Sequence, residues 1–167
     1  DSAQDYRLRT LEQLEIFVIE SEGKRIEKLE SNFSELTNNE YEENENIQIL
    51  GRKIKTIKLS KGSVWMSFQE ICEGPRSAKD YIEVCSEFHT VFVSGVPIMN
   101  ENNSDAARRF IALVDECYER NVNLILSLET NLNEIYRGKR LAEPFKRTLS
   151  RLEEMRSREY LSRPHLI

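Results

Sequence analysis

The clearest pattern in the chain is HTVFVSGVPIMNENNSDAARRFIALVDECYERNVNLILSL, which spans residues 89–128. Residues 89–93 and 122–128 are rich in β-branched and other apolar side chains, which is typical of strands. Residues 104–120 carry apolar side chains at helical spacing: Ala107, Phe110, Ile111, Val114, Cys117 and Tyr118. The strand 122–128 is apolar on both faces, which favours a parallel sheet covered on both sides. The stretch therefore predicts a βαβ unit with a right-handed crossover.

Shorter patterns flank this unit. Residues 14–19, 47–50, 53–59 and 63–68 predict strands, the last two joined as a hairpin at Ser60-Lys61-Gly62. Ile54 has the wrong parity to share a face with Ile57 and Leu59, which predicts either a bulge or a strand that is only half regular. Helices are predicted at 22–36, 68–73, from Ser77 onward and at 143–160. Asp80, three residues after Ser77, completes a capping box. Residues 37–46 contain four Glu between 40 and 46 and predict a mobile acidic loop.

Together these elements predict an α/β fold. A βαβ unit with parallel strands is preceded by a small α+β lobe with a β-hairpin and followed by a C-terminal helix. We expect two lobes: residues 1–75 with the hairpin and the acidic loop, and residues 76–167 with the basic C-terminal helix.

Composition excludes several classes of protein. The chain has 167 residues, of which 32% are charged and 39% hydrophobic, with a net charge of -5. No run of about 18 apolar residues exists, so we expect no membrane span, and no signal peptide is visible. The three cysteines are far apart and form no Cys-x-x-Cys pair, which indicates a reducing compartment. Because the chain starts at Asp1 rather than Met, we expect that it is cut from a longer protein.

The sequence contains no motif for a phosphate loop, neither Gly-x-x-x-x-Gly-Lys-Ser/Thr nor Gly-x-Gly-x-x-Gly. Asp115 and Glu116 lie in the middle of a predicted helix, where we expect a solvated face rather than a metal site. His89 begins a predicted buried strand and His165 lies in the tail, so neither indicates catalysis. We therefore predict no catalytic residue and no metal ligand in this chain.

The remaining candidates are arginines. Arg108 and Arg109 follow the loop that leaves the first strand of the βαβ unit, and Arg137 and Arg140 lie on the loop that leaves the second. Parallel strands end at one edge, where ligands collect in open α/β sheets. These side chains either face phosphates or a charged neighbour, or form surface salt bridges worth about 0–1 kcal/mol each. Within the first pair we expect Arg109 to point outward and Arg108 to lie along the sheet edge.

Several runs resemble one known family. The resemblance covers nearly the whole chain and is strongest in 74–161. The matching runs are Asp5-Tyr6-Arg7-Leu8-Arg9, residues 74–81, residues 88–93 with Val96-Pro97, residues 107–115, residues 147–152 and residues 157–161. They resemble the carboxyl-terminal part of the ZapE-type ATPases, bacterial cell-division proteins grouped with the mitochondrial ATPases named for yeast ATPase family gene one.

This resemblance implies an AAA-type P-loop ATPase as the parent. The family's phosphate loop, its Mg²⁺-binding acids and its first sensor lie upstream of the Asp-Tyr-Arg segment, so ATP and Mg²⁺ belong to the parent. The fragment would be inactive alone and would pack on the ATPase core or bind a partner. The family also implies a cytoplasmic location, cell division with the tubulin-like division protein as partner, and, in mitochondria, quality control of respiratory-complex subunits.

The order of elements here is strand, helix, strand and arginine-bearing loop. It resembles the part of an ATPase core that runs from the second acidic residue to the sensor. Ser94-Gly95 replace the acidic residue that would end the first strand. Two alternatives stay open. One is a free-standing protein-interaction module with no nucleotide role. The other is a nucleic-acid-binding tail at residues 137–163, which hold nine Lys/Arg and four Asp/Glu. The second is disfavoured because only Tyr136, Phe145 and Tyr160 are available there to stack on bases.

Overall fold

The computed structural model describes residues 2–20 and 25–167. Six strands form the main sheet: β1 (Phe17–Ile19), β2 (Glu42–Glu43), β5 (Lys58–Ser60), β6 (Ser63–Ser67), β7 (Thr90–Val96) and β8 (Asn123–Leu128). Their order across the sheet is β1-β8-β7-β6-β5-β2. Strands β1, β8, β7 and β6 run parallel to one another. Strand β5 pairs antiparallel with β6, and β2 pairs antiparallel with β5. The predicted α/β class with parallel strands is confirmed.

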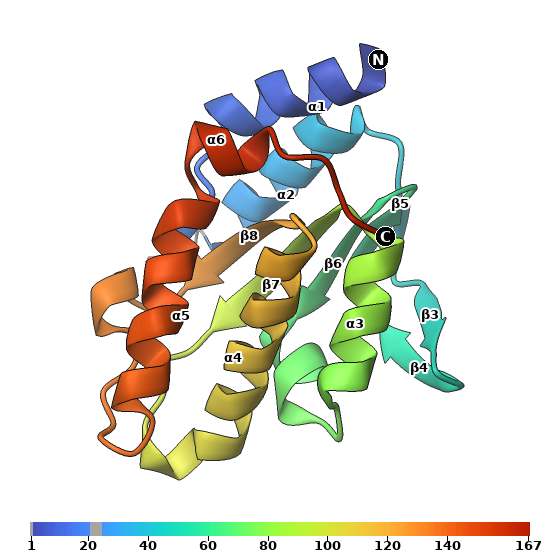
Figure 1. Cartoon of the computed structure of the whole chain (residues 1–167). Helices are drawn as coiled ribbons and strands as arrows, with labels where there is room; N and C mark the ends of the chain where they lie inside the picture. Colours follow the sequence, from blue (N-terminus) through green and yellow to red (C-terminus); the bar gives the residue numbers. More distant parts are fainter. Residues whose placement is uncertain (1, 21–24) are drawn as a thin grey trace.

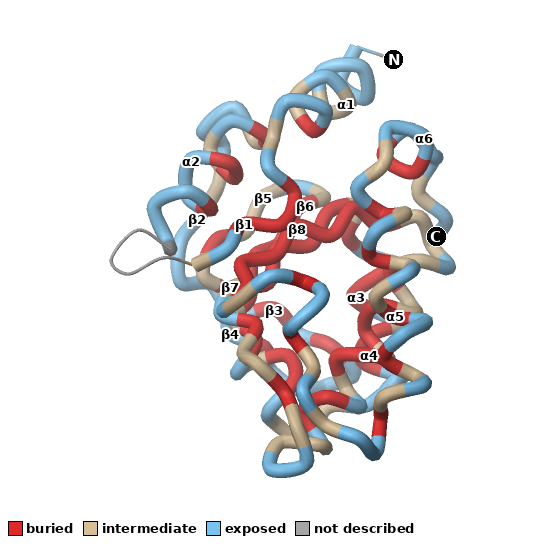
Figure 2. Tube along the Cα trace, turned by 90° about the vertical axis from the view of Figure 1, so that its left-hand side faces the viewer, coloured by how far each residue is buried: buried red, intermediate tan, exposed pale blue. Residues whose placement is uncertain are grey.

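Helices cover both faces of this sheet. They are α1 (Ser2–Gln13), α2 (Arg25–Thr37), α3 (Ala78–Glu87), α4 (Ser104–Glu119), α5 (Ala142–Met155) and α6 (Arg158–Leu161), with the short π-helix η1 (Gln69–Glu73) and the short 3-10 helices η2 (Glu101–Asn103) and η3 (Leu132–Glu134). Figure 2 shows α2 on one side of the buried strands and α3, α4 and α5 on the other. Helices α1 and α6 lie together at one end (Figure 1).

The predicted βαβ unit is β7-α4-β8. Its two strands are parallel neighbours, with Val91 opposite Leu124 and Val93 opposite Leu126. Helix α4 buries Phe110 completely. The strand β7 runs three residues beyond the predicted end at residue 93, because an irregularity between Val93 and Val96 lets pairing with β8 resume.

The predicted strand 53–59 belongs to two different sheets, so the prediction of one continuous strand is wrong. Its first half is β4 (Arg52–Lys55), which pairs with β3 (Asn46–Ile49) in a separate two-stranded sheet. Its second half is β5, which forms the predicted hairpin with β6. Ile54 is buried and paired with Ile47. Its parity differs from that of Leu59 because the chain changes sheet between them, not because of a bulge.

The acidic segment 37–46 is not a loop throughout, which corrects that part of the prediction. It contains β2, the edge strand of the main sheet. Asn38, Asn39 and Asn44 have φ of 53°, 60° and 57°, a left-handed conformation that Asn tolerates better than most residues. Asparagines therefore make the turns that bring the segment back to the sheet. The first residues of the helix predicted at 22–36, residues 22–24, lie outside the described residues.

The predicted C-terminal helix 143–160 is divided into α5 and α6. The break lies at Ser157, whose hydroxyl accepts the Tyr160 N–H over 3.2 Å and so caps α6. Helix α1 had no counterpart in the sequence analysis, because most of its side chains are exposed and Leu11 is its only buried residue. It docks on α2 and α6.

A single sheet crosses the expected boundary at residue 75. Strands β1 and β6 precede the boundary, and they pair with β8 and β7, which follow it. The division into two lobes stays a prediction. Among residues 2–20 and 25–167, no helix has the length and apolar character that crossing a membrane requires.

Candidate functional site

The parallel strands end at one edge of the sheet, called here the carboxyl edge. The Ser127 hydroxyl at the end of β8 donates to Glu20 Oε1 over 2.6 Å. The Gly95 amide in β7 donates to Ser127 Oγ over 2.8 Å and to Glu20 Oε1 over 3.1 Å. Beside them, Trp65 Nε1 donates to Ser94 Oγ over 3.0 Å. Ser94 and Gly95 therefore sit within an internal hydrogen-bond network at the centre of the edge.

Beyond this edge, the loops that leave β7 and β8 lie side by side. Met99 and Tyr136 form a parallel β-bridge between them. The Glu101 carboxylate accepts the backbone N–H groups of Lys139 over 2.6 Å and of Arg140 over 3.2 Å. These hydrogen bonds lower the pKa of Glu101. A carboxylate from one loop thus holds the arginine-bearing backbone of the other.

Three of the four predicted arginines are exposed near these loops. Arg108 lies in the second turn of α4, and Arg137 and Arg140 lie on the loop fixed by Glu101. Their guanidinium groups form no hydrogen bond or ion pair with any residue that the structure describes. Their donors are therefore available to a ligand or a neighbouring protein surface.

Arg109 faces the protein instead of solvent, which corrects the expected orientation of this pair. Its Nε donates to the Arg76 carbonyl over 3.2 Å, and its Nη1 donates to the Cys72 carbonyl over 3.3 Å. Consecutive helical positions point about 100° apart, so Arg108 is turned to solvent while Arg109 ties α4 to the segment before α3. Arg109 therefore has a structural role in this chain.

The acidic pair in α4 is engaged in ion pairs. Asp115 Oδ1 lies 2.5 Å from Arg151 Nη1 of α5, and Glu116 lies 3.8 Å from Arg120. The Arg151 guanidinium also packs 4.9 Å from the centre of the Tyr118 ring. The expected solvated face is thus partly an α4–α5 contact. In the described part of the chain, no group of three or more His, Cys, Asp or Glu is placed to hold a metal ion.

The cysteines are buried and unlike reactive thiols. Cys85 Sγ and Cys117 Sγ lie 3.5 Å apart between α3 and α4. The contact with Cys85 and burial raise the pKa of Cys117, and burial raises the pKa of Cys72. Because the thiolate is the nucleophile, these thiols are in poor surroundings for covalent chemistry.

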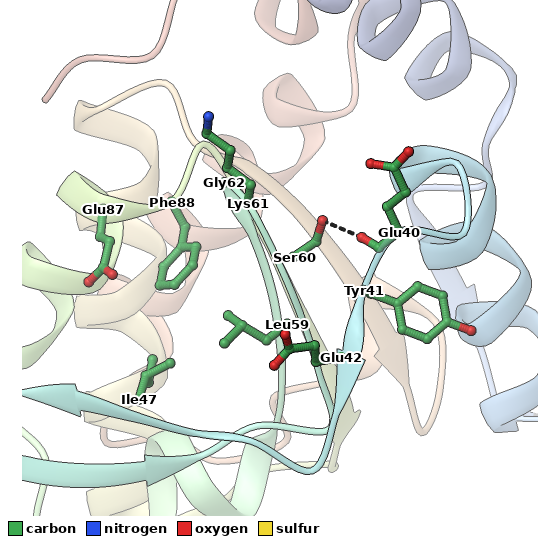
Figure 3. Close-up of a pocket in the computed structure, with 10 residues that line it drawn as sticks. All are labelled: Glu40, Tyr41, Glu42, Ile47, Leu59, Ser60, Lys61, Gly62, Glu87 and Phe88. Carbon is green, nitrogen blue, oxygen red and sulfur yellow. Dashed lines mark hydrogen bonds between the residues drawn. The ribbon is translucent and has the colours of Figure 1, made fainter.

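A groove of about 680 Å³, called here the acidic groove, runs along the β5 and β2 edge of the sheet (Figure 3). Ile47, Leu59 and Phe88 form its apolar wall, and its charged side chains are Glu40, Glu42, Glu87 and Lys61. Figure 3 shows Lys61 pointing away from the apolar wall. No local sequence pattern predicts this groove, because its lining comes from four separate segments of the chain.

Comparison with known proteins agrees with the family that the sequence motifs indicated. The chain is 41% identical to the cell division protein ZapE of Escherichia coli K12 over 166 residues, which are 99% of this chain and 44% of ZapE. It is 30% identical to an uncharacterised protein of Schizosaccharomyces pombe over 138 residues, which are 81% of this chain and 30% of that protein. It is also 30% identical to lactation elevated protein 1 homolog B of Danio rerio over 139 residues, which are 81% of this chain and 27% of that protein.

The chain thus spans less than half the length of these relatives. No solved structure matches it. The model of the family described as AFG1-like ATPase matches residues 1–164, nearly the full length of the chain. This protein therefore belongs to the AFG1-like ATPase family.

Proposed function

We propose that this chain is the carboxyl-terminal part of an ATP-hydrolysing protein and that it packs on an ATPase core. In this proposal the core supplies the phosphate loop and the Mg²⁺-binding acids, and ATP and Mg²⁺ bind there. Two facts support it. The chain covers 44% of ZapE, and its own sequence holds no phosphate-loop motif. The main charge-stabilising elements of phosphoryl transfer are then outside this chain, so it does not hydrolyse ATP alone.

The observation that carries the proposal is the set of unpaired arginines at the carboxyl edge. Arg108, Arg137 and Arg140 are exposed, and none pairs with a described residue. A planar guanidinium matches the geometry of phosphate oxygens and keeps its charge at any physiological pH. In ATPases, an arginine placed on the transferred phosphoryl group contributes about 10³–10⁵ in rate. Arg108 and Arg140 are therefore our candidates for presentation to a nucleotide on the core.

We extend the proposal to cell division, because the relative that shares 41% identity is named a cell division protein. The parent would then act in the cytoplasm, with the tubulin-like division protein as its partner.

A second candidate function is protein binding without any nucleotide role. The acidic groove favours it, because an apolar wall flanked by three glutamates suits a polypeptide segment with apolar and basic side chains. In this alternative the arginines at the carboxyl edge contact another protein.

Two measurements test the proposal. Purified chain should release no phosphate from ATP, whereas the full-length parent should. Arg108→Gln and Arg140→Gln, made singly in the full-length parent, should each lower ATP turnover by at least tenfold. Lys53→Gln is the control, because it removes an exposed charge from the separate β3–β4 sheet. Unchanged turnover in both arginine variants would remove the nucleotide-facing part of the proposal and favour the interaction module.

A further inference from the structure

Basic side chains also meet at the opposite, amino edge of the sheet. A cavity of about 240 Å³, called here the amino-edge cavity, lies between α1, the end of α2 and the starts of β6 and β7. Arg7, Lys61 and His89 all line it. Its volume lies below the roughly 300–1,000 Å³ that is typical of pockets for drug-sized ligands, so it suits a small chemical group.

Arg7 is the most informative residue of this cavity. It lies on α1 and is half-buried, and burial lowers the pKa of its guanidinium. No carboxylate among the described residues lies within ion-pair distance of it, and none of its guanidinium N–H groups donates to a described acceptor. A partly desolvated charge without a partner is costly, and a guanidinium carries five N–H donors. The arrangement therefore lacks an acceptor.

Lys61 and His89 line the same cavity. Lys61 lies on the β5–β6 turn and is exposed, with no ion pair to a described residue. The His89 ring lies with Nδ1 2.8 Å from Thr90 Oγ1, whereas its Nε2 has no hydrogen-bonding partner in the described residues. Burial, Arg7 and His165 lower the pKa of His89 to about 4, so the ring is neutral at pH 7 and donates a single N–H.

The acceptors and hydroxyls that line the cavity leave these donors unmatched. Glu40 is the only carboxylate in the lining, and it is not within ion-pair distance of Arg7 or Lys61. The Ser60 hydroxyl donates to the Glu40 carbonyl over 2.7 Å, and the Thr37 hydroxyl donates to the Phe33 carbonyl over 2.7 Å. At pH 7 two cations thus face one carboxylate.

We propose that the amino-edge cavity binds a small oxyanion, either phosphate or the terminal phosphoryl group of a larger ligand, between Arg7 and Lys61 and beside the His89 ring. Charge-assisted hydrogen bonds from a guanidinium and an ammonium to such oxygens are stronger than neutral ones. The site is formed by residues at the amino ends of the strands, so it is separate from the arginines at the carboxyl edge. The proposal does not depend on the proposed ATPase function.

The test is a titration of the chain with inorganic phosphate at constant ionic strength, followed by NMR of the histidine ring signals. The chain has only two histidines, so both signals can be assigned by His89→Gln. We expect a saturable shift of the His89 signal. Arg7→Gln should weaken binding at least tenfold and Lys61→Gln severalfold, whereas Arg9→Gln should leave it unchanged. Arg9 is the matched control, because it is exposed on the same helix and does not line the cavity.

A parallel titration with ADP separates the two sources of the oxyanion. If ADP binds more tightly than phosphate and its binding depends on Arg7, the ligand is a phosphoryl group of a larger molecule. If phosphate binds more tightly than ADP, the ligand is free phosphate. Two results would overturn the proposal: a His89 signal that does not saturate, or equal weakening by Arg7→Gln and Arg9→Gln. If Arg7→Gln lowers the melting temperature enough to unfold the chain, Lys61→Gln at the exposed turn decides, and unchanged affinity there overturns the proposal as well.

Discussion

Replacing Phe110 with alanine should lower the free energy of unfolding by about 3–5 kcal/mol, the range for truncation of a buried phenylalanine. The ring has 0% exposure and lies where three elements meet. Its centre is 6.0 Å from that of Phe68, just before η1, and 6.2 Å from that of Phe145 in α5. Each aromatic pair adds about 0.5–1.5 kcal/mol beyond area burial, and both are lost together. We therefore expect a cost in the upper half of the range.

This loss is large compared with the about 5–15 kcal/mol by which most domains are stable. For a chain of this size, each kcal/mol corresponds to about 2–4 °C in melting temperature, so Phe110→Ala should melt about 8–20 °C lower. The cavity cannot close easily, because the side chains around it, such as Phe68 and Phe145, are themselves almost completely buried.

Urea unfolding monitored by tryptophan fluorescence measures this directly, since Trp65 is the only tryptophan and is completely buried. Arg108→Ala is the control, because it changes an exposed residue two positions earlier in α4 and should stay within about 0.5 kcal/mol. The slope of free energy against urea should be the same in both variants. A Phe110→Ala protein that melts within a degree or two of the unmodified chain would refute the assignment of this helix face to the core.

Asp80→Ala should cost about 1–3 kcal/mol in urea unfolding, because the buried carboxylate pairs with the half-exposed Arg52 and accepts the Ser77 N–H of the capping box; a cost below about 0.5 kcal/mol would contradict this. Tyr160→Phe should cost about 1–3 kcal/mol in thermal melts, since its hydroxyl donates to two buried carbonyls between α4 and β8, and an unchanged melting temperature would count against it. His89 has a folded-state pKa of about 4, below the unfolded value of 6.5. Between these two pH values the unfolded state binds more protons than the folded state. The free energy of unfolding therefore falls as the pH drops from 6.5 toward 4. From pH 7 to pH 5 the unmodified chain should therefore lose about 2 kcal/mol more than His89→Gln, and equal losses in urea titrations at the two pH values would exclude this titration.

Short-range patterns determined the centre of this fold. The helical spacing of residues 104–120 and the doubly apolar strand 122–128 predict α4 and β8, because both signals depend on neighbours within one element. The capping box at Ser77 and Asp80 is similarly local, and it is present in the structure. The family was also recognisable from sequence, because its motifs are contiguous runs of residues.

Contacts between distant segments were decided only by the tertiary structure. Ile54 belongs to a separate sheet because β4 pairs with β3, a choice that the alternation within residues 53–59 does not contain. Helix α1 is stabilised by docking of Leu11 rather than by its own pattern. The orientation of Arg109 depends on two carbonyls more than 30 residues away in the chain. The acidic groove and the amino-edge cavity are each built from several segments, so their chemistry exists only after the chain has folded and brought those side chains together.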